Sequence, residues 1–223
     1  MDFQIETYMQ TLLRELQNAF GSQLLYLGLQ GSYSRGEATE SSDIDAVVLL
    51  EELTPEQMGR YRKVLQMVGN SEKSCGFISG RKEFANWNRF EICLLLHETK
   101  DYYGRLGDFA PTYTAQDIKD YLKINLGNLY HELCHRYIHA DRQQAEQSLR
   151  FCGKMSFYLL QALGILRQNR YAPSAKELEN LLEPEDLQVL ALSQSLKNPD
   201  YAVDFEKDFR LLFDWCSRLL QTL

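Results

Sequence analysis

LGLQGSYSRG, residues 27–36, and SSDIDAVV, residues 41–48, decide how this chain folds. The apolar run from Leu24 to Gln30 predicts a short buried strand, which Gly31 breaks. Residues 44–50 are apolar apart from Asp45 and predict a second strand, placed centrally in its sheet. A strand, a small polar turn and another strand are therefore expected.

Asp43 and Asp45 stand where the second predicted strand begins. Because side chains alternate across a strand, both carboxylates are expected to project from the same face. Two such carboxylates repel each other unless a divalent cation lies between them. Mg²⁺ is the usual choice for oxygen ligands beside phosphates. The pair therefore predicts a metal site at the mouth of this strand.

The turn between the strands carries groups suited to phosphate. Gly31 lets the backbone approach a ligand closely, and Ser32 adds a hydroxyl donor. If a short helix starts over residues 32–35, its free N–H groups form an anion site, to which Arg35 adds charge. Transfer from a nucleoside triphosphate requires both a phosphate cradle and metal carboxylates, and this unit predicts both.

These residues resemble the nucleotidyltransferase superfamily that includes polymerase β and the antibiotic nucleotidyltransferases. Its pattern is an apolar strand, Gly-Ser, a further Gly and Asp-x-Asp entering a second strand. The matching residues here are Gly31, Ser32, Gly36, Asp43 and Asp45. The motif covers about residues 24–50 and specifies no substrate. More broadly, the chain looks like the small bacterial enzymes that nucleotidylate aminoglycosides or lincosamides.

The resemblance also implies a third carboxylate on a neighbouring strand, which binds metal or serves as general base. Residues 90–96, FEICLLL, are expected to form that strand, and Glu91 leads into it much as Asp45 leads into its own. Glu98, beyond the other end of the run, is the alternative. A solvent-exposed glutamate at a strand end is the third interpretation of Glu91.

Apolar spacing over residues 3–20 predicts a helix before the first strand. After the second strand, Thr54, Pro55 and Gln57 predict a helix start with a capping box. Residues 75–79 are compatible with one more strand.

From about residue 114 onward the sequence contains no convincing strand, and residues 151–166 mark a long amphipathic helix. The expected fold class is α+β, with a nucleotidyltransferase domain over residues 1–110 and an all-helical bundle over residues 111–223. In the first domain, the resemblance implies a mixed, mostly antiparallel sheet with helices behind it.

Composition and net charge limit the classes of partner that this chain is expected to bind. The chain has 223 residues, of which 44% are hydrophobic, and its formal net charge is -7. Nucleic-acid binders usually show a basic stripe, so a nucleic-acid partner is not expected. An acidic balance suits a cationic acceptor, although the need to remain in solution explains such a charge equally well.

The five cysteines form no CxxC pair, which argues against a disulfide framework or a zinc knot. The N-terminus has no signal-peptide pattern, and no run reaches the roughly 18–20 apolar residues that span a bilayer. A cytoplasmic location without membrane contact is expected.

The expected activity is metal-dependent transfer of a nucleoside monophosphate, AMP from ATP in the first place, to a hydroxyl of a small-molecule acceptor. Two Mg²⁺ ions and release of pyrophosphate are implied by the resemblance. One alternative acceptor is a protein side chain, as in nucleotidyltransferase antitoxins. Another alternative is a non-catalytic nucleotide-binding protein of the same fold. The sequence gives no indication of oligomeric state.

Overall fold

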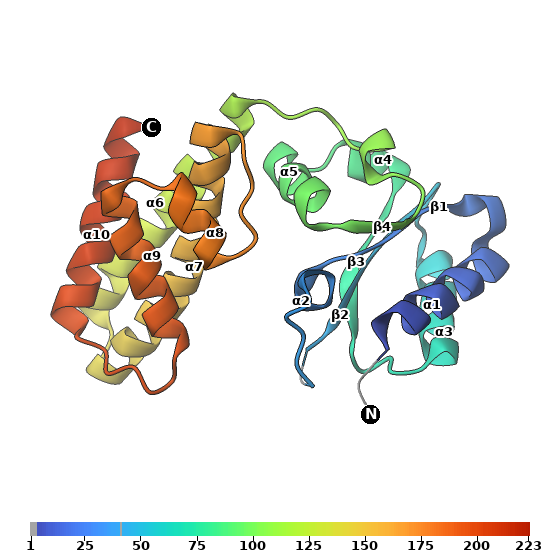
Figure 1. The fold of residues 1–223 in the computed structure, drawn as a ribbon, viewed down its shortest axis with the longest axis horizontal. Helices are drawn as coiled ribbons and strands as arrows, with labels where there is room; N and C mark the ends of the chain where they lie inside the picture. Colours follow the sequence, from blue (N-terminus) through green and yellow to red (C-terminus); the bar gives the residue numbers. More distant parts are fainter. Residues whose placement is uncertain (1–3, 41) are drawn as a thin grey trace. The chain divides into compact units, whose positions relative to one another are not determined.

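The computed structural model describes residues 4–40 and 42–223. The chain divides into two compact units, Met1–Tyr113 and Thr114–Leu223. Strands and helices are mixed in the first unit, whereas the second is built of helices (Figure 1). The expected fold class, an α+β domain followed by an all-helical part, is confirmed.

A four-stranded sheet in the order β3-β2-β1-β4 forms the centre of the first unit. The strands are β1 (Leu24–Leu29), β2 (Ile44–Leu50), β3 (Ser74–Gly80) and β4 (Lys100–Tyr103). Strand β1 pairs antiparallel with both β2 and β4, and β2 pairs parallel with β3. The sheet is therefore mixed and mostly antiparallel, as expected.

Helices cover both faces of this sheet (Figure 1). They are α1 (Ile5–Phe20), α2 (Gly31–Arg35), α3 (Pro55–Val68), α4 (Arg81–Ala85) and α5 (Arg89–Glu98). The predicted capping box at the start of α3 is present, with Thr54 and Gln57 exchanging hydrogen bonds. Short 3-10 turns follow at Gly21–Gln23 and Leu106–Asp108.

Alternation along β2 divides its side chains between two apolar cores. Ile44, Ala46, Val48 and Leu50 pack in the core that α1 and α3 share. The opposite core holds Val47 and Leu49 from β2, Phe84 from α4 and Ile92 from α5. Because Asp45 has the parity of Val47, it faces the same side of the sheet as α4 and α5.

The second unit consists of α6 (Ala115–His139), α7 (Arg142–Gln168), α8 (Ala175–Leu178), α9 (Pro184–Lys197) and α10 (Phe205–Thr222), with a 3-10 turn at Glu179–Leu181. No strand occurs in residues 114–223, all of which the structure describes. Side-chain caps begin four of these helices, at Thr114, Asp141, Ser174 and Asp204.

One buried carboxylate ties three of these helices together. Asp186 of α9 is fully buried and accepts hydrogen bonds from Arg167 of α7 and from Trp215 and Arg218 of α10. Burial raises the pKa of this carboxyl, but the hydrogen bonds outweigh burial and hold the pKa below its ordinary value. The lowered pKa favours the ionised carboxylate of Asp186, which links α7, α9 and α10 through hydrogen bonds.

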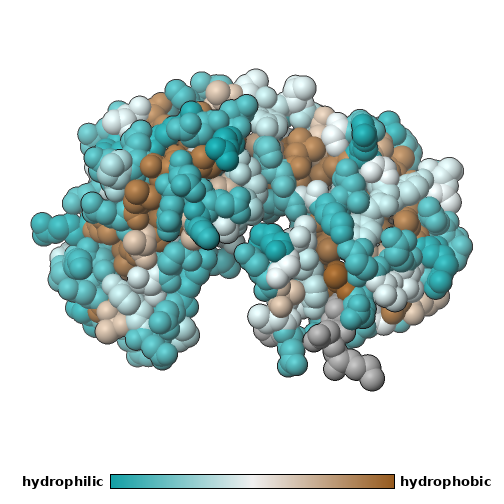
Figure 2. Space-filling model, viewed as in Figure 1, coloured by the Kyte–Doolittle hydropathy of each residue, from teal (hydrophilic) through white to brown (hydrophobic). Residues whose placement is uncertain are grey.

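The face of the molecule that Figure 2 shows is mainly hydrophilic, and hydrophobic residues show in small areas between hydrophilic ones. Within the part of the chain that the structure describes, no helix is long and apolar enough to cross a membrane.

The expectation that residues 90–96 form a strand is wrong. They belong to α5, whose first turn is capped by Asn88: its side-chain oxygen accepts from the backbone N–H of Phe90 (3.0 Å) and of Glu91 (3.2 Å). A short, continuously apolar run suits a buried helix as well as a buried strand, and the cap selects the helix. The strand in this region is β4, which starts at Lys100 instead.

Candidate active site

Strands β1 and β2 are joined through the helix α2. At the end of β1, the backbone N–H of Gln30 donates to the carbonyl of Asp45 at 2.8 Å, which brings the start of α2 beside the start of β2. The helix runs from Gly31 to Arg35 and ends at Gly36, which has left-handed backbone angles. The short helix that the sequence predicted at the Gly-Ser turn is confirmed.

The Asp45 carboxylate is half-buried on β2, and Asp43 is exposed one residue before the strand. Burial raises the pKa of Asp45, and the negative charge of Asp43 raises it further. A hydrogen bond from Cys75 and the positive charge of Arg35 lower the same pKa. The structure thus brings Asp43, Asp45 and Arg35 within electrostatic reach of one another.

Gly31 lies against the carboxylate of Asp45. A Cβ built on Gly31 would lie 2.0 Å from Oδ2 of Asp45, and Gly31 has a φ of +69°. No other residue type fits there without moving the carboxylate. Gly31 of the Gly-Ser turn and Asp45 of the Asp-x-Asp pair, which the sequence placed in one strand-turn-strand unit, are therefore in contact. Ser32, the next residue of α2, is half-exposed.

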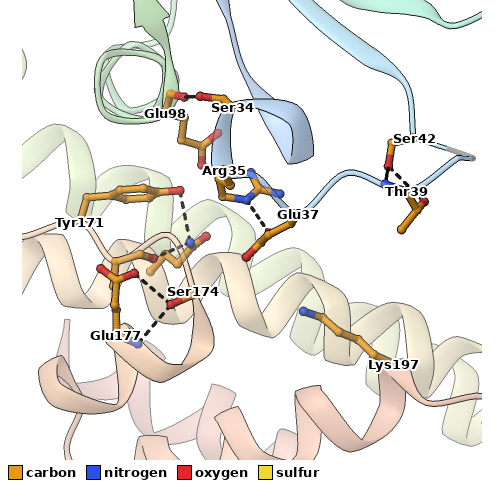
Figure 3. A network of polar contacts seen from close by, with 12 residues as sticks. Ser34, Arg35, Glu37, Thr39, Ser42, Glu98, Tyr171, Ser174, Glu177 and Lys197 are labelled. Atoms are coloured by element: carbon orange, nitrogen blue, oxygen red, sulfur yellow. Dashed lines mark hydrogen bonds and ion pairs between the residues drawn. The ribbon is translucent and has the colours of Figure 1, made fainter. Parts of the chain in front are cut away.

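The remaining side chains of α2 form local polar contacts, which Figure 3 shows. Arg35 donates to Glu37 at 2.9 Å, and the Ser34 hydroxyl lies 3.5 Å from the backbone carbonyl of Glu98. In the loop before Asp43, the Thr39 N–H donates to the Ser42 hydroxyl at 2.8 Å. Glu98, at the end of α5, is therefore beside α2.

Glu91 lies elsewhere than predicted. It is exposed in the first turn of α5, where its carboxylate accepts a hydrogen bond from Trp87 Nε1 at 2.5 Å. Seven residues of helix separate it from Glu98, a rise of about 10 Å. Glu91 does not lead into a strand beside Asp45, because the residues around it form the helix α5.

The strand that pairs parallel with β2 carries no carboxylate. Residues 74–80 form β3, and their sequence, SCGFISG, has neither Asp nor Glu. In the parallel pairing, Cys75 stands in register with Asp45. Sequence reasoning missed Cys75, because nothing local to residues 75–79 shows which residue of β2 each one pairs with.

The donor set fits a magnesium ion that is completed by substrate. Among residues 4–40 and 42–223, no three His, Cys, Asp or Glu side chains are arranged to hold a metal on their own. Mg²⁺ is commonly bound by one or two carboxylates together with substrate phosphates and water. Asp43 and Asp45, with the open backbone of Gly31 beside them, meet that requirement.

Two solved structures are similar to this chain. The solved structure of spectinomycin adenyltransferase AAD(9) from Enterococcus faecialis with ATP and spectinomycin aligns with 97% of this chain and 99% of its own, at a TM-score of 0.57 and 12% identity. At that identity the match shows a shared fold, and it extends over both units. A structure of a toxin-antitoxin with AMP-PNP aligns with 52% of this chain and 88% of its own, at a TM-score of 0.36 and 20% identity.

No curated protein matches the sequence at a significant level. The family model of the nucleotidyltransferase domain matches residues 9–109. This range contains the whole β1–α2–β2 unit and the strand β3 beside it. Residues 9–109 therefore match a nucleotidyltransferase domain, as the Gly-Ser and Asp-x-Asp motifs indicated.

Proposed function

We propose that this chain transfers AMP from ATP to a hydroxyl of a small-molecule acceptor and releases pyrophosphate. One observation carries the proposal: the Asp45 carboxylate, with Asp43 beside it, packs against Gly31 at the start of α2. Metal-binding carboxylates and a close-approach turn for phosphate thereby share one strand–helix–strand unit.

In this mechanism Asp43 and Asp45 would hold Mg²⁺, two ions in the complete reaction, which would supply positive charge beside the triphosphate. Backbone N–H groups of Gly31 and Ser32 and the Ser32 hydroxyl hold the outer phosphates, and Arg35 supplies positive charge. Positioning of this kind accounts for most of the catalysis in phosphoryl transfer.

The acceptor hydroxyl oxygen forms a bond to the α-phosphorus, and the bond from that phosphorus to the bridging oxygen of the β-phosphate breaks. The electron pair of the broken bond leaves with pyrophosphate. The hydroxyl proton passes to solvent water, because β3 offers Cys75 and no carboxylate to Asp45. Glu91 has no part in this step.

Two observations favour ATP and a small acceptor over other substrates. The structure of similar fold that covers 97% of this chain is a spectinomycin adenyltransferase solved with ATP and spectinomycin. The net charge of -7 favours a cationic acceptor, such as an aminoglycoside-like compound, over a polyanion.

A second candidate is a protein of the same fold that binds a nucleotide and transfers nothing. It is favoured by the missing carboxylate on β3, since a general base typically contributes about 10²–10⁴-fold to such a reaction. Under this alternative, Mg²⁺ and ATP bind at Asp43 and Asp45 but no pyrophosphate appears with any acceptor.

The test combines binding and turnover. Thermal stability is measured with each nucleoside triphosphate, with and without Mg²⁺, on the wild type and Asp45→Ala. A ligand at about 100 times its dissociation constant stabilises the native state by about 2.7 kcal/mol. We expect a Mg²⁺-dependent shift with ATP that Asp45→Ala loses, followed by pyrophosphate release with aminoglycoside-like acceptors. ATP binding without release across the acceptor panel selects the non-catalytic alternative, and no shift with any triphosphate refutes both.

A further inference from the structure

The residue that β3 presents to Asp45 is Cys75. Strands β2 and β3 are parallel, and Asp45 and Cys75 are register partners. In a parallel pair, register partners project from the same face of the sheet, so the Cys75 thiol is on the same side as the Asp45 carboxylate. Its proximity lowers the pKa of that acid and so favours the ionised form. Cys75 is itself exposed, so it lies at the open side of the site and not in a core.

The Asp45 carboxylate thus has a neighbour on each of two sides. On one side is Gly31, the first residue of α2, where an added Cβ would be 2.0 Å from Oδ2. On the other side is Cys75 of β3, which stands in register with Asp45 and lowers the pKa of its carboxyl. A side chain with steric contact on one flank and a hydrogen-bond donor on the other has little freedom to rotate.

Arg35 acts on Asp45 through its positive charge, while its Nε donates a hydrogen bond to Glu37 at 2.9 Å. Asp43 repels Asp45 and so tends to turn the two carboxylates apart. The Cys75 thiol, on the side of Asp45 away from Gly31, opposes this rotation. A carboxylate at position 75 would instead have repelled Asp45.

We propose that Cys75 is a positioning residue that holds the metal-binding carboxylate of Asp45 in its working orientation. The inference rests on the proposed function, because it assumes that Asp45 binds Mg²⁺ with ATP. Residues that orient a metal ligand from behind typically change metal affinity by about 10–100-fold when they are replaced. A thiol is a weak donor, so an effect at the lower end of that range is expected.

Two substitutions at one position test the proposal. Cys75→Ala removes the donor, whereas Cys75→Ser replaces it with a hydroxyl donor of similar size. The measurement is the Mg²⁺ concentration that gives half of the ATP-dependent thermal shift, together with the melting temperature without ligand. Cys134→Ala, a half-exposed thiol on α6, controls for the loss of a cysteine as such.

We expect Cys75→Ala to need about 10-fold more Mg²⁺ than the wild type. Cys75→Ser and Cys134→Ala should stay near the wild-type value. The proposal is overturned if Cys75→Ala keeps the wild-type Mg²⁺ requirement, even when its ligand-free melting temperature falls. It is also overturned if Cys75→Ser is as impaired as Cys75→Ala.

Failure of the underlying function gives a different result. In that case the wild type itself shows no Mg²⁺-dependent shift with ATP, and both the function and the role of Cys75 are rejected together. A wild-type shift with unchanged Mg²⁺ dependence in Cys75→Ala rejects the role of Cys75 alone.

Discussion

The Cα of Gly31 and the carboxylate of Asp45 are in direct contact, and a Cβ on Gly31 would lie 2.0 Å from Oδ2 and 3.0 Å from Cγ of that side chain. Gly31 opens α2 and Asp45 belongs to β2, so the antiparallel pairing of β1 with β2 creates the contact. This contact therefore limits both the position of the Gly31–Ser32 turn and the orientation of the Asp45 carboxylate.

Gly31→Ala should abolish the Mg²⁺-dependent stabilisation by ATP. The new methyl group displaces the Asp45 carboxylate, and the left-handed backbone angle adds a cost of about 1 kcal/mol or more. Urea denaturation measures the loss of stability, and thermal shift with Mg²⁺ and ATP measures the loss of binding.

Gly36→Ala is the matched control. Gly36 has a φ of +71°, close to that of Gly31, but an added Cβ would meet no heavy atom within 4 Å. It should therefore lose a similar amount of backbone stability and still bind Mg²⁺ and ATP. If Gly31→Ala binds as well as Gly36→Ala, the contact with Asp45 is irrelevant to the site.

Asp45→Asn should stabilise the ligand-free protein at neutral pH. Burial and the charge of Asp43 raise the pKa of Asp45 in the folded state above its unfolded value, which is about 3.9. Between those two pKa values the folded protein binds more protons, so the stability contribution of this group falls as the pH rises. Above the folded pKa, the cost of the ionised carboxylate is present in full.

Denaturation of the wild type and of Asp45→Asn from pH 3 to pH 8, without Mg²⁺, measures this cost. The advantage of the amide should grow as the pH rises through the window and vanish near its lower end. An Asp45→Asn protein that is less stable than the wild type at pH 8 would show that favourable contacts outweigh burial. Loss of Mg²⁺-dependent ATP binding in the same variant would reveal a trade of stability for function.

Glu91→Gln should leave nucleotidyl transfer within about 2-fold of the wild type. Its carboxylate accepts from Trp87 Nε1 in the first turn of α5, and the amide oxygen of glutamine preserves that acceptor. Steady-state turnover and the ATP-dependent thermal shift are the measurements. A fall in turnover of about 100-fold or more would show that Glu91 acts as the general base after all. Glu98→Gln is the companion variant, because Glu98 lies beside α2.

The β1–α2–β2 part of the site was predictable because its signals are local. Gly31, Ser32, Asp43 and Asp45 lie within 15 residues, and strand alternation alone places both carboxylates at one mouth. The capping box of Thr54 and Gln57 was predictable for the same reason, since a cap depends on four consecutive residues.

What the sequence left undetermined depends on distant pairing. Residues 90–96 are apolar at nearly every position, so neither a period of 2 nor one of 3.6 stands out, and the Asn88 cap decides for a helix. Cys75 gains its place only through the parallel register of β3 with β2, which brings together residues 30 positions apart. The expected strand over residues 90–96 was wrong for this reason, and the identity of the third carboxylate stays a prediction.

Asp186→Ala should destabilise the helical unit by about 3 kcal/mol or more, because it leaves Trp215 Nε1 and two guanidinium groups without their shared acceptor. Glu183→Ala is the control. Glu183 lies 3.6 Å from the same Arg167 but is 56% exposed, so its removal should cost less than about 1 kcal/mol.

Urea denaturation of both variants measures the difference in their stability. Its pH dependence separates the contribution of the Asp186 charge from that of packing. The pKa of Asp186 is below its ordinary value, so the stability that this carboxylate contributes is present above the unfolded pKa and is lost as the pH falls through the folded one. The gap between wild type and Asp186→Ala should therefore narrow in acid. A gap that is constant down to pH 2 would mean that the side chain stabilises the unit by packing, with its charge contributing nothing.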